Sequence, residues 1–183
     1  MKIMWKILPI LFNTEMVQAI LSDRKTCTRR VIKDAVKENQ EINKNEGKIY
    51  KPPFQPGDIL YVRETWCDDR QFTHASTAGR YFYKASENGK FKWKPSIHMP
   101  KEIARIWLKV TSVRVERLQE MTDEDCEKEG LENACKKCES HLFNCDICMN
   151  NDGIKEEFKE LWDSAIKKAD IDKYGWSATR RTI

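Results

Sequence analysis

The fold of this chain is organised around the stretch LSDRKTCTRR, which spans residues 21–30. Four of the seven residues from 24 to 30 are cationic, and two threonines lie among them. An apolar segment with helical spacing precedes the stretch and predicts a helix at residues 14–22, with Asn13 able to cap its start. Amides, hydroxyls and positive charges that converge where this helix ends would suit a phosphate, a carboxylate or an oxyanion. A solvated charged turn is the competing interpretation.

Composition is that of a globular chain of ordinary size. The 183 residues are 40% hydrophobic and 34% charged, which favours a single domain spanning residues 1–183. The net charge is only +4, so a nucleic-acid surface has to be local, as at residues 24–30. No apolar run approaches ~20 residues, which argues against a membrane span. Residues 1–12 predict a first strand and no signal peptide, so a cytoplasmic location is expected.

Local patterns predict an α+β protein with short strands. Thr122 and Asp125 have capping-box spacing and predict a helix that ends near Gly130. Apolar residues with helical spacing predict a further amphipathic helix at residues 154–166. Extended segments are expected at residues 7–12 (an edge strand), 26–32, 58–66 (a buried strand), 81–83 and 91–94.

The segment 103–118 has the clearest strand pattern. Its apolar alternation changes phase at Thr111-Ser112, which predicts one long strand with a bulge or a sharp bend. A small closed barrel needs such bends. Trp107 and Trp162 are expected in the core, whereas residues 33–54 are polar and predict an insertion or mobile loop.

Several polar and aromatic residues are candidates for binding a ligand. Arg63 and Glu64 follow the buried strand, where charged side chains either line a cleft or only pair with their neighbours. Lys92, Trp93 and Lys94 alternate phosphate-binding and base-stacking character. Single histidines are usually structural, and a direct role for His98 is the less favoured alternative. The full set expected to bind nucleic acid or another ligand is Arg24, Arg29, Arg30, Arg63, Glu64, Trp66, Trp93, Lys94 and His98.

Four cysteines have the spacing of a structural zinc site. Cys135 and Cys138 form one Cys-x-x-Cys pair, Cys145 and Cys148 form a second, and six residues separate the pairs. Four thiolates close a tetrahedral shell around zinc and leave no open position. Iron–sulfur or disulfides are the alternatives, and His141 could replace one thiolate. The knuckle would occupy an insertion at residues 133–152, while Cys27, Cys67 and Cys126 receive no ligand role.

The chain resembles the ASCH domain family of the PUA-like superfamily, in particular its phage-encoded members. The resemblance begins with LFNTEMVQAILSDRKTCTRR at residues 11–30. It continues in the same order through QPGDILYVRETW (55–66), KPSIHMP (94–100), VRVERL (113–118) and TDEDCEKEG (122–130). It implies a small PUA-like β-barrel with flanking helices, here with the zinc knuckle inserted, and an association with RNA. The basic ending at residues 177–183 departs from the aromatic-rich last strand of such proteins, so this barrel strand is missing or replaced.

The same resemblance implies a possible catalytic set. Some bacterial ASCH domains remove the acetyl group from acetylated cytidine with a lysine, a threonine and a glutamate. By motif, Lys25, Thr28 and Glu129 match these three residues. The threonine would be the nucleophile, a lysine with a lowered pKa would activate it, and the glutamate would shuttle a proton. Alternatively, Lys25 and Thr28 bind a phosphate and Glu129 forms an ordinary salt bridge with Lys25.

These observations leave three functions open. The first expectation is binding of RNA or a modified nucleotide in a basic cleft. The second is hydrolysis at the same cleft, either of a modified nucleoside as an amidohydrolase or of RNA as a ribonuclease. The third is a phage accessory role in the host cytoplasm, in which the zinc knuckle binds a host protein.

Overall fold

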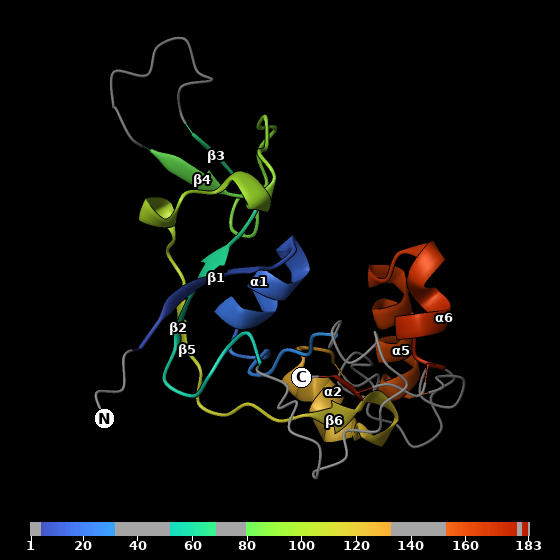
Figure 1. The fold of residues 1–183 in the computed structure, drawn as a ribbon. Helices are drawn as coiled ribbons and strands as arrows, with labels where there is room; N and C mark the ends of the chain where they lie inside the picture. Colours follow the sequence, from blue (N-terminus) through green and yellow to red (C-terminus); the bar gives the residue numbers. More distant parts are fainter. Residues whose placement is uncertain (1–4, 32–51, 69–79, 133–152, 179–180, 183) are drawn as a thin grey trace, which may run out of the picture. The chain divides into compact units, whose positions relative to one another are not determined.

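The computed structural model describes residues 5–31, 52–68, 80–132, 153–178 and 181–182 (Figure 1). The chain divides into two compact units. Unit 1 comprises residues 1–22 and 54–113, and unit 2 comprises residues 23–53 and 114–183. The one-domain organisation expected from the sequence stays a prediction.

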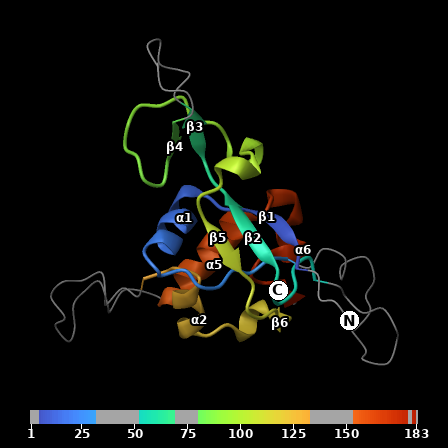
Figure 2. The same ribbon diagram turned by 90° about the vertical axis from the view of Figure 1, so that its left-hand side faces the viewer.

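A three-stranded sheet forms the centre of unit 1 (Figure 2). β1 (Ile7–Leu11) pairs in parallel with β2 (Ile59–Arg63), and β5 (Trp107–Lys109) pairs antiparallel with the other side of β2. β1 therefore lies at an edge of the described sheet, as its sequence predicts. Gly57, with φ of 97°, makes the turn that leads into β2.

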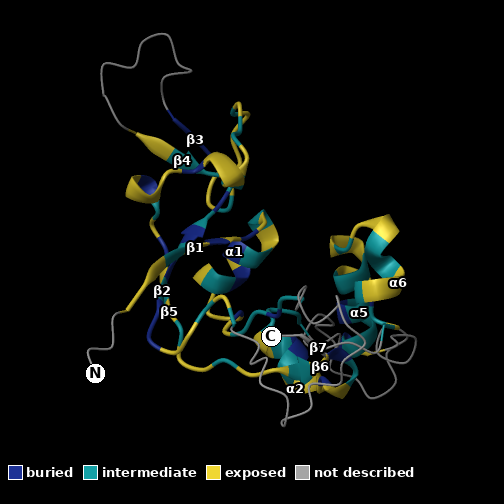
Figure 3. Ribbon diagram, viewed as in Figure 1, coloured by how far each residue is buried: buried dark blue, intermediate teal, exposed yellow. Residues whose placement is uncertain are grey.

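The helix α1 (Thr14–Leu21) packs its apolar residues with alternate residues of this sheet. The predicted cap is confirmed, because the Asn13 side chain accepts a hydrogen bond from the Met16 amide at 2.8 Å. The period-2 burial of β2 identifies its inward face, and Figure 3 shows the same pattern. The buried core of this cluster consists of Ile10, Phe12, Val17, Leu60, Val62 and Ile106.

The expected strand at residues 58–66 is two strands in the structure. β2 ends at Arg63, and β3 (Trp66–Asp68) then pairs with β4 (Tyr81–Tyr83), which confirms the strand expected at 81–83. The prediction of a strand at residues 91–94 is wrong. Lys94 forms only an isolated bridge with Trp66, and residues 89–93 form tight turns. Two 3₁₀ helices follow, at Ser96–His98 and Lys101–Ile103.

Unit 2 is mainly helical. The buried residues Leu118, Met121, Cys126, Ile154 and Phe158 form its core, and the expected Trp162 packs against them. Its elements are β6 (Glu116–Arg117), a 3₁₀ turn (Leu118–Glu120), α2 (Asp123–Lys128), α5 (Ile154–Ala165), a 3₁₀ turn (Lys168–Asp170), α6 (Ile171–Tyr174) and β7 (Arg181–Thr182). β7 pairs antiparallel with β6, so a short strand is present near the chain end.

Two further strand predictions differ from the structure. The long strand expected at 103–118 is reduced to β5 and β6, and the chain passes from unit 1 to unit 2 after Val113, close to the observed phase change. Of the strand expected at residues 26–32, residues 26–30 form no strand, because the amides of Thr26 and Cys27 bond to the end of a helix. Trp107 is 46% exposed and not in the core, since β5 turns that side chain outward.

The described residues thus form an α+β protein with three small sheets, none of which closes into a barrel. None of the described helices has the length and apolar character that crossing a membrane requires.

Candidate functional site

The basic stretch lies against the carboxyl end of α2. The amides of Thr26 and Cys27 both donate to the Lys128 carbonyl, at 2.8 and 2.9 Å, and Lys25 forms a β-bridge with Glu129. The last carbonyls of a helix lack partners within the helix, so an adjacent extended segment can satisfy them. This local pairing places the Lys25 side chain beside that of Glu129, 104 residues later in the chain.

Lys25 and Glu129 form a buried ion pair. The Lys25 ammonium nitrogen Nζ lies 2.5 Å from Glu129 Oε2 and 3.0 Å from the Glu129 carbonyl oxygen. The two side chains are only 2% and 6% exposed. A charge-assisted hydrogen bond of this kind is short and strong where water is excluded.

Arg29 extends the ion pair into a cluster. Its guanidinium donates from Nη1 to Glu129 Oε1 at 3.3 Å and from Nη2 to Glu116 Oε2 at 3.2 Å. Asp125 Oδ2 lies 3.5 Å from the same Nη2. The Glu129 carboxylate therefore joins a lysine to an arginine, with one oxygen directed to each. Glu116 and Asp125 also belong to this site, although no local sequence pattern indicates a place for either there.

Burial changes the protonation chemistry of this cluster. Desolvation lowers the pKa of Lys25 from its ordinary value, against the opposing attraction of Glu129, and the positive charge of Arg30 lowers it further. Burial also raises the pKa of the Cys27 thiol. Cys27 is thereby kept in its protonated, weakly nucleophilic form, whereas Lys25 loses its proton more readily than an exposed lysine.

The third residue of the expected catalytic set is Thr28. Its hydroxyl oxygen is buried and has no hydrogen-bond partner among the residues that the structure describes. The structure therefore brings Lys25 and Glu129 into contact, but no hydrogen bond connects Thr28 to either. A buried hydroxyl without a partner is costly, and it retains its full capacity to bond a ligand.

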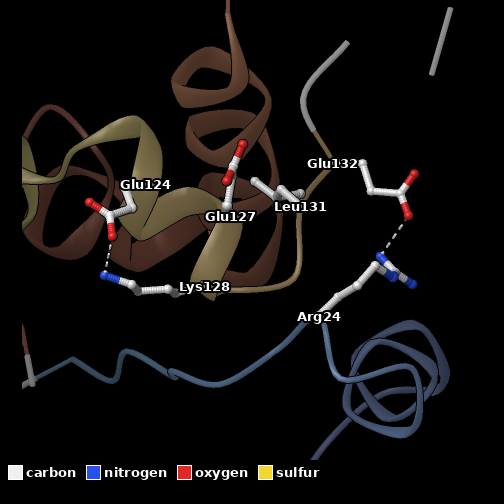
Figure 4. A pocket seen from close by; sticks show the side chains of 6 residues that line it. All are labelled: Arg24, Glu124, Glu127, Lys128, Leu131 and Glu132. Carbon is white, nitrogen blue, oxygen red and sulfur yellow. Dashed lines mark ion pairs between the residues drawn. The ribbon is translucent and has the colours of Figure 1, made fainter. Parts of the chain in front are cut away.

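A hollow of about 560 Å³ lies beside the same helix. Figure 4 shows Arg24 and Glu132, 3.3 Å apart, on one side of it, and Lys128 and Glu124, 2.9 Å apart, on another. The full lining is Arg24, Glu124, Glu127, Lys128, Leu131 and Glu132. Three carboxylates and two cations make the lining slightly acidic, which does not favour a polyanion.

Arg63 and Glu64, in unit 1, are engaged within the protein. Arg63 donates from Nε to the Met99 carbonyl at 2.8 Å and from Nη2 to the Ile97 carbonyl. Glu64 is 1% exposed and receives two hydrogen bonds from Arg105, each at 2.8 Å. The geometry favours neighbour pairing over a cleft for both residues. Arg105 was missed because nothing in its local sequence marks it as the partner of a carboxylate 41 positions earlier.

The remaining candidates also lie in unit 1. Lys94 Nζ lies 2.7 Å from Asp68 Oδ2 and 4.6 Å from the centre of the Trp66 ring. Trp93 is half-buried, and its ring lies edge-on to that of Phe91. His98 is exposed at the end of its 3₁₀ helix. A cleft shared by these residues and the Lys25 cluster stays a prediction.

The expected zinc ligands Cys135, Cys138, Cys145 and Cys148 lie outside the described residues. Within the described ranges, no group of three or more His, Cys, Asp or Glu side chains is arranged to hold a metal ion. Cys27, Cys67 and Cys126 are free thiols in the structure, and the expectation that they bind no metal stays a prediction.

No protein-family model, curated protein or solved structure matches this chain.

Proposed function

We propose that this protein binds a modified nucleoside at the Lys25–Glu129 site and hydrolyses an acyl amide on its base, as in acetylated cytidine. The observation that carries the proposal is the buried 2.5 Å contact between Lys25 and Glu129. It joins two of the three residues that the resemblance to ASCH amidohydrolases implies, from segments 104 positions apart.

The third residue, Thr28, supplies the nucleophile. Its hydroxyl oxygen attacks the carbonyl carbon of the acyl group, and Lys25 in its neutral form accepts the hydroxyl proton. The carbon–nitrogen bond then breaks, and the amine of the base leaves with a proton delivered through Glu129. Water hydrolyses the resulting threonine ester and releases the carboxylic acid. The lowered pKa of Lys25 supports its role as the base.

Binding of RNA without turnover, the first expectation from the sequence, has less support at this site. Arg29 is 6% exposed and paired with carboxylates, and Arg24 bonds to Glu132 and to the Gly130 carbonyl. Cations that are neutralised within the protein add little attraction for phosphates. Hydrolysis of RNA would require Lys25, Thr28 and Glu129 to contact a phosphodiester in place of an acyl amide.

We also propose, from the sequence, that the chain belongs to the ASCH family and that its strands close into a barrel. The zinc knuckle would bind a host protein. Their support is the ordered set of matching segments and the Cys-x-x-Cys spacing. The α+β composition of the described residues is compatible with them.

The test is incubation of the full-length protein with N4-acetylcytidine, with release of cytidine and acetate followed by chromatography. We expect Thr28→Ala to abolish turnover and Thr28→Ser to retain part of it, because serine keeps the hydroxyl. Thr26→Ala is the matched control, since Thr26 is exposed in the same turn and only its backbone bonds to α2.

Turnover that survives in Thr28→Ala would overturn the proposed nucleophile. Equal loss in Thr26→Ala and Thr28→Ala would show that the turn is needed only for folding. If the wild type binds N4-acetylcytidine in calorimetry but releases no acetate, the site is a binding site and the hydrolysis is refuted.

A further inference from the structure

A second surface, in unit 1, has a composition unlike the rest of the chain. Residues 80–94, RYFYKASENGKFKWK, contain five cationic side chains, five aromatic ones and a single acidic one. The net charge of this segment is therefore +4, the same as that of the whole chain. The other 168 residues carry 28 cations and 28 acids, so the excess positive charge resides in this segment.

The segment is anchored to unit 1 at both ends. At its start, β4 pairs with β3, and the Lys84 amide donates to the Thr65 carbonyl at 3.0 Å. At its end, Trp66 and Lys94 exchange two backbone hydrogen bonds, of 2.7 and 3.2 Å. The loop between these anchors is therefore held on the β3–β4 sheet.

Three aromatic rings of the segment form a continuous series. The rings of Phe82 and Phe91 stack at 5.0 Å, and Trp93 lies edge-on to Phe91, also at 5.0 Å. All three are half-buried, so part of each remains accessible. Gly89 permits this arrangement, because a Cβ at that position would lie 2.3 Å from the Phe91 ring. Tyr81, 41% exposed, is a separate ring that contacts Trp66 and does not belong to this series.

Four of the five cations of the segment are exposed, and Lys94 is half-buried. Lys94 lies between the Asp68 carboxylate and the Trp66 ring, where it holds the end of the loop. The other four, Arg80, Lys84, Lys90 and Lys92, are exposed. Glu87 is the acidic residue of the segment, so the exposed charge on this surface is strongly positive.

We propose that residues 80–94 form a binding surface for single-stranded nucleic acid. Unpaired bases stack on accessible aromatic rings, with a contribution that depends little on base identity, and the exposed cations attract the phosphates. Base faces are inaccessible within a duplex, so the aromatic series favours single strands. An acidic peptide would use the cations but not the ring faces. This surface does not depend on the proposed hydrolysis, which involves residues of unit 2.

The test uses fluorescence anisotropy of the full-length protein with a labelled 12-nucleotide oligo(U). We expect the logarithm of the binding constant to fall linearly with the logarithm of the salt concentration, with a slope near −2.8. This slope corresponds to four phosphate contacts, one for each exposed cation, with about 0.7 counterions released per contact. Lys90→Ala/Lys92→Ala should reduce this slope to about −1.4. The matched control is Lys167→Ala/Lys168→Ala, which removes the same charge from exposed positions of unit 2 and should change nothing.

A second variant tests the rings. Trp93→Ala should weaken oligo(U) binding about tenfold, whereas Trp93→Phe should retain most of it, because both Trp and Phe present a π-face. The exposed lysine pair keeps the proposal testable if Trp93→Ala does not fold. Equal weakening in the two lysine variants, equal affinity for a duplex, or binding to anionic phosphatidylserine vesicles without binding to oligo(U) would each overturn the proposal.

Discussion

At the scale of single residues, the main feature is the ionic cluster around Glu129. Removing a lysine, an arginine and a glutamate from water is costly, and the cost is recovered only where each charge is bonded. Glu129 satisfies this condition, because its two oxygens contact Lys25 and Arg29 separately. Such a cluster contributes little net stability when intact, but it tolerates the loss of one partner poorly.

We therefore expect Glu129→Gln to lower the free energy of unfolding by about 3 kcal/mol, because the buried Lys25 loses its counter-charge and Arg29 loses one of its three carboxylate partners. Urea unfolding followed by circular dichroism would measure the change. Glu132→Gln is the control, since Glu132 pairs with Arg24 at a site where the side chains are 42% and 39% exposed. Its effect should stay below about 1 kcal/mol. Equal losses in the two variants would contradict a buried, coupled cluster.

At the scale of elements, α2 determines the site. It has only six residues, and its start is fixed by reciprocal hydrogen bonds between Thr122 and Asp125. Gly130 follows the helix with φ of 99°, a conformation that glycine adopts without strain. The two ends together fix the position of Glu129, and Asp125 also contacts Arg29. A capping residue thus supports the ionic cluster.

Thr122→Ala should therefore destabilise the protein by about 1 kcal/mol through loss of the cap. The same element predicts a dependence on acid. Burial alone would raise the pKa of Asp125, but its hydrogen bonds with Thr122 and the charge of Arg29 lower it overall. The unfolded chain then binds this proton more tightly, so stability falls as the pH drops below about 4, through the lowered pKa.

Urea midpoints measured at pH 5 and pH 3 would test this dependence. Asp125→Asn should have a smaller difference between the two midpoints than the wild type, because the titrating group is gone. An unchanged difference in Asp125→Asn would assign the acid sensitivity to other carboxylates.

At the scale of the whole molecule, each of the two units has apolar clusters of its own. In unit 1, α1 and the β1-β2-β5 sheet enclose one cluster, and Trp66, Met99 and Ile103 form another. In unit 2, α2 and α5 contribute to the core.

The two Cys-x-x-Cys pairs predict a zinc site. The purified protein should contain one zinc per chain by elemental analysis, and Cys138→Ser/Cys145→Ser should contain none. Removal of the metal with a chelator should increase amide exchange in residues 134–150 and spare the described cores. Cys27→Ser is the control and should retain its zinc. A full zinc content in Cys138→Ser/Cys145→Ser would refute the site.

The elements that the sequence alone predicted are those with strong local signals. The cap at Asn13, the capping box of α2, the amphipathic α5 and the strands at residues 7–11 and 81–83 follow from neighbouring side chains. The Thr, Val and Ile residues of the segment 26–32 predict a strand, but the amides of Thr26 and Cys27 bond to a helix end, which no local pattern indicates. Similarly, the side chain of Trp107 is apolar, and only its place on β5 exposes it.

The sequence by itself determined the α+β composition and the main helices, because spacing and capping act over a few positions. The tertiary structure alone decided how deeply the charge pairs are buried and which further partners they have. The pairing of Glu64 with Arg105 over 41 positions had no signal in the local sequence, and that of Lys25 with Glu129 over 104 was indicated only by the resemblance; both depend on how the backbone returns on itself. The physical reason is that charge pairing acts through space, so it becomes specific only when burial removes the competing water.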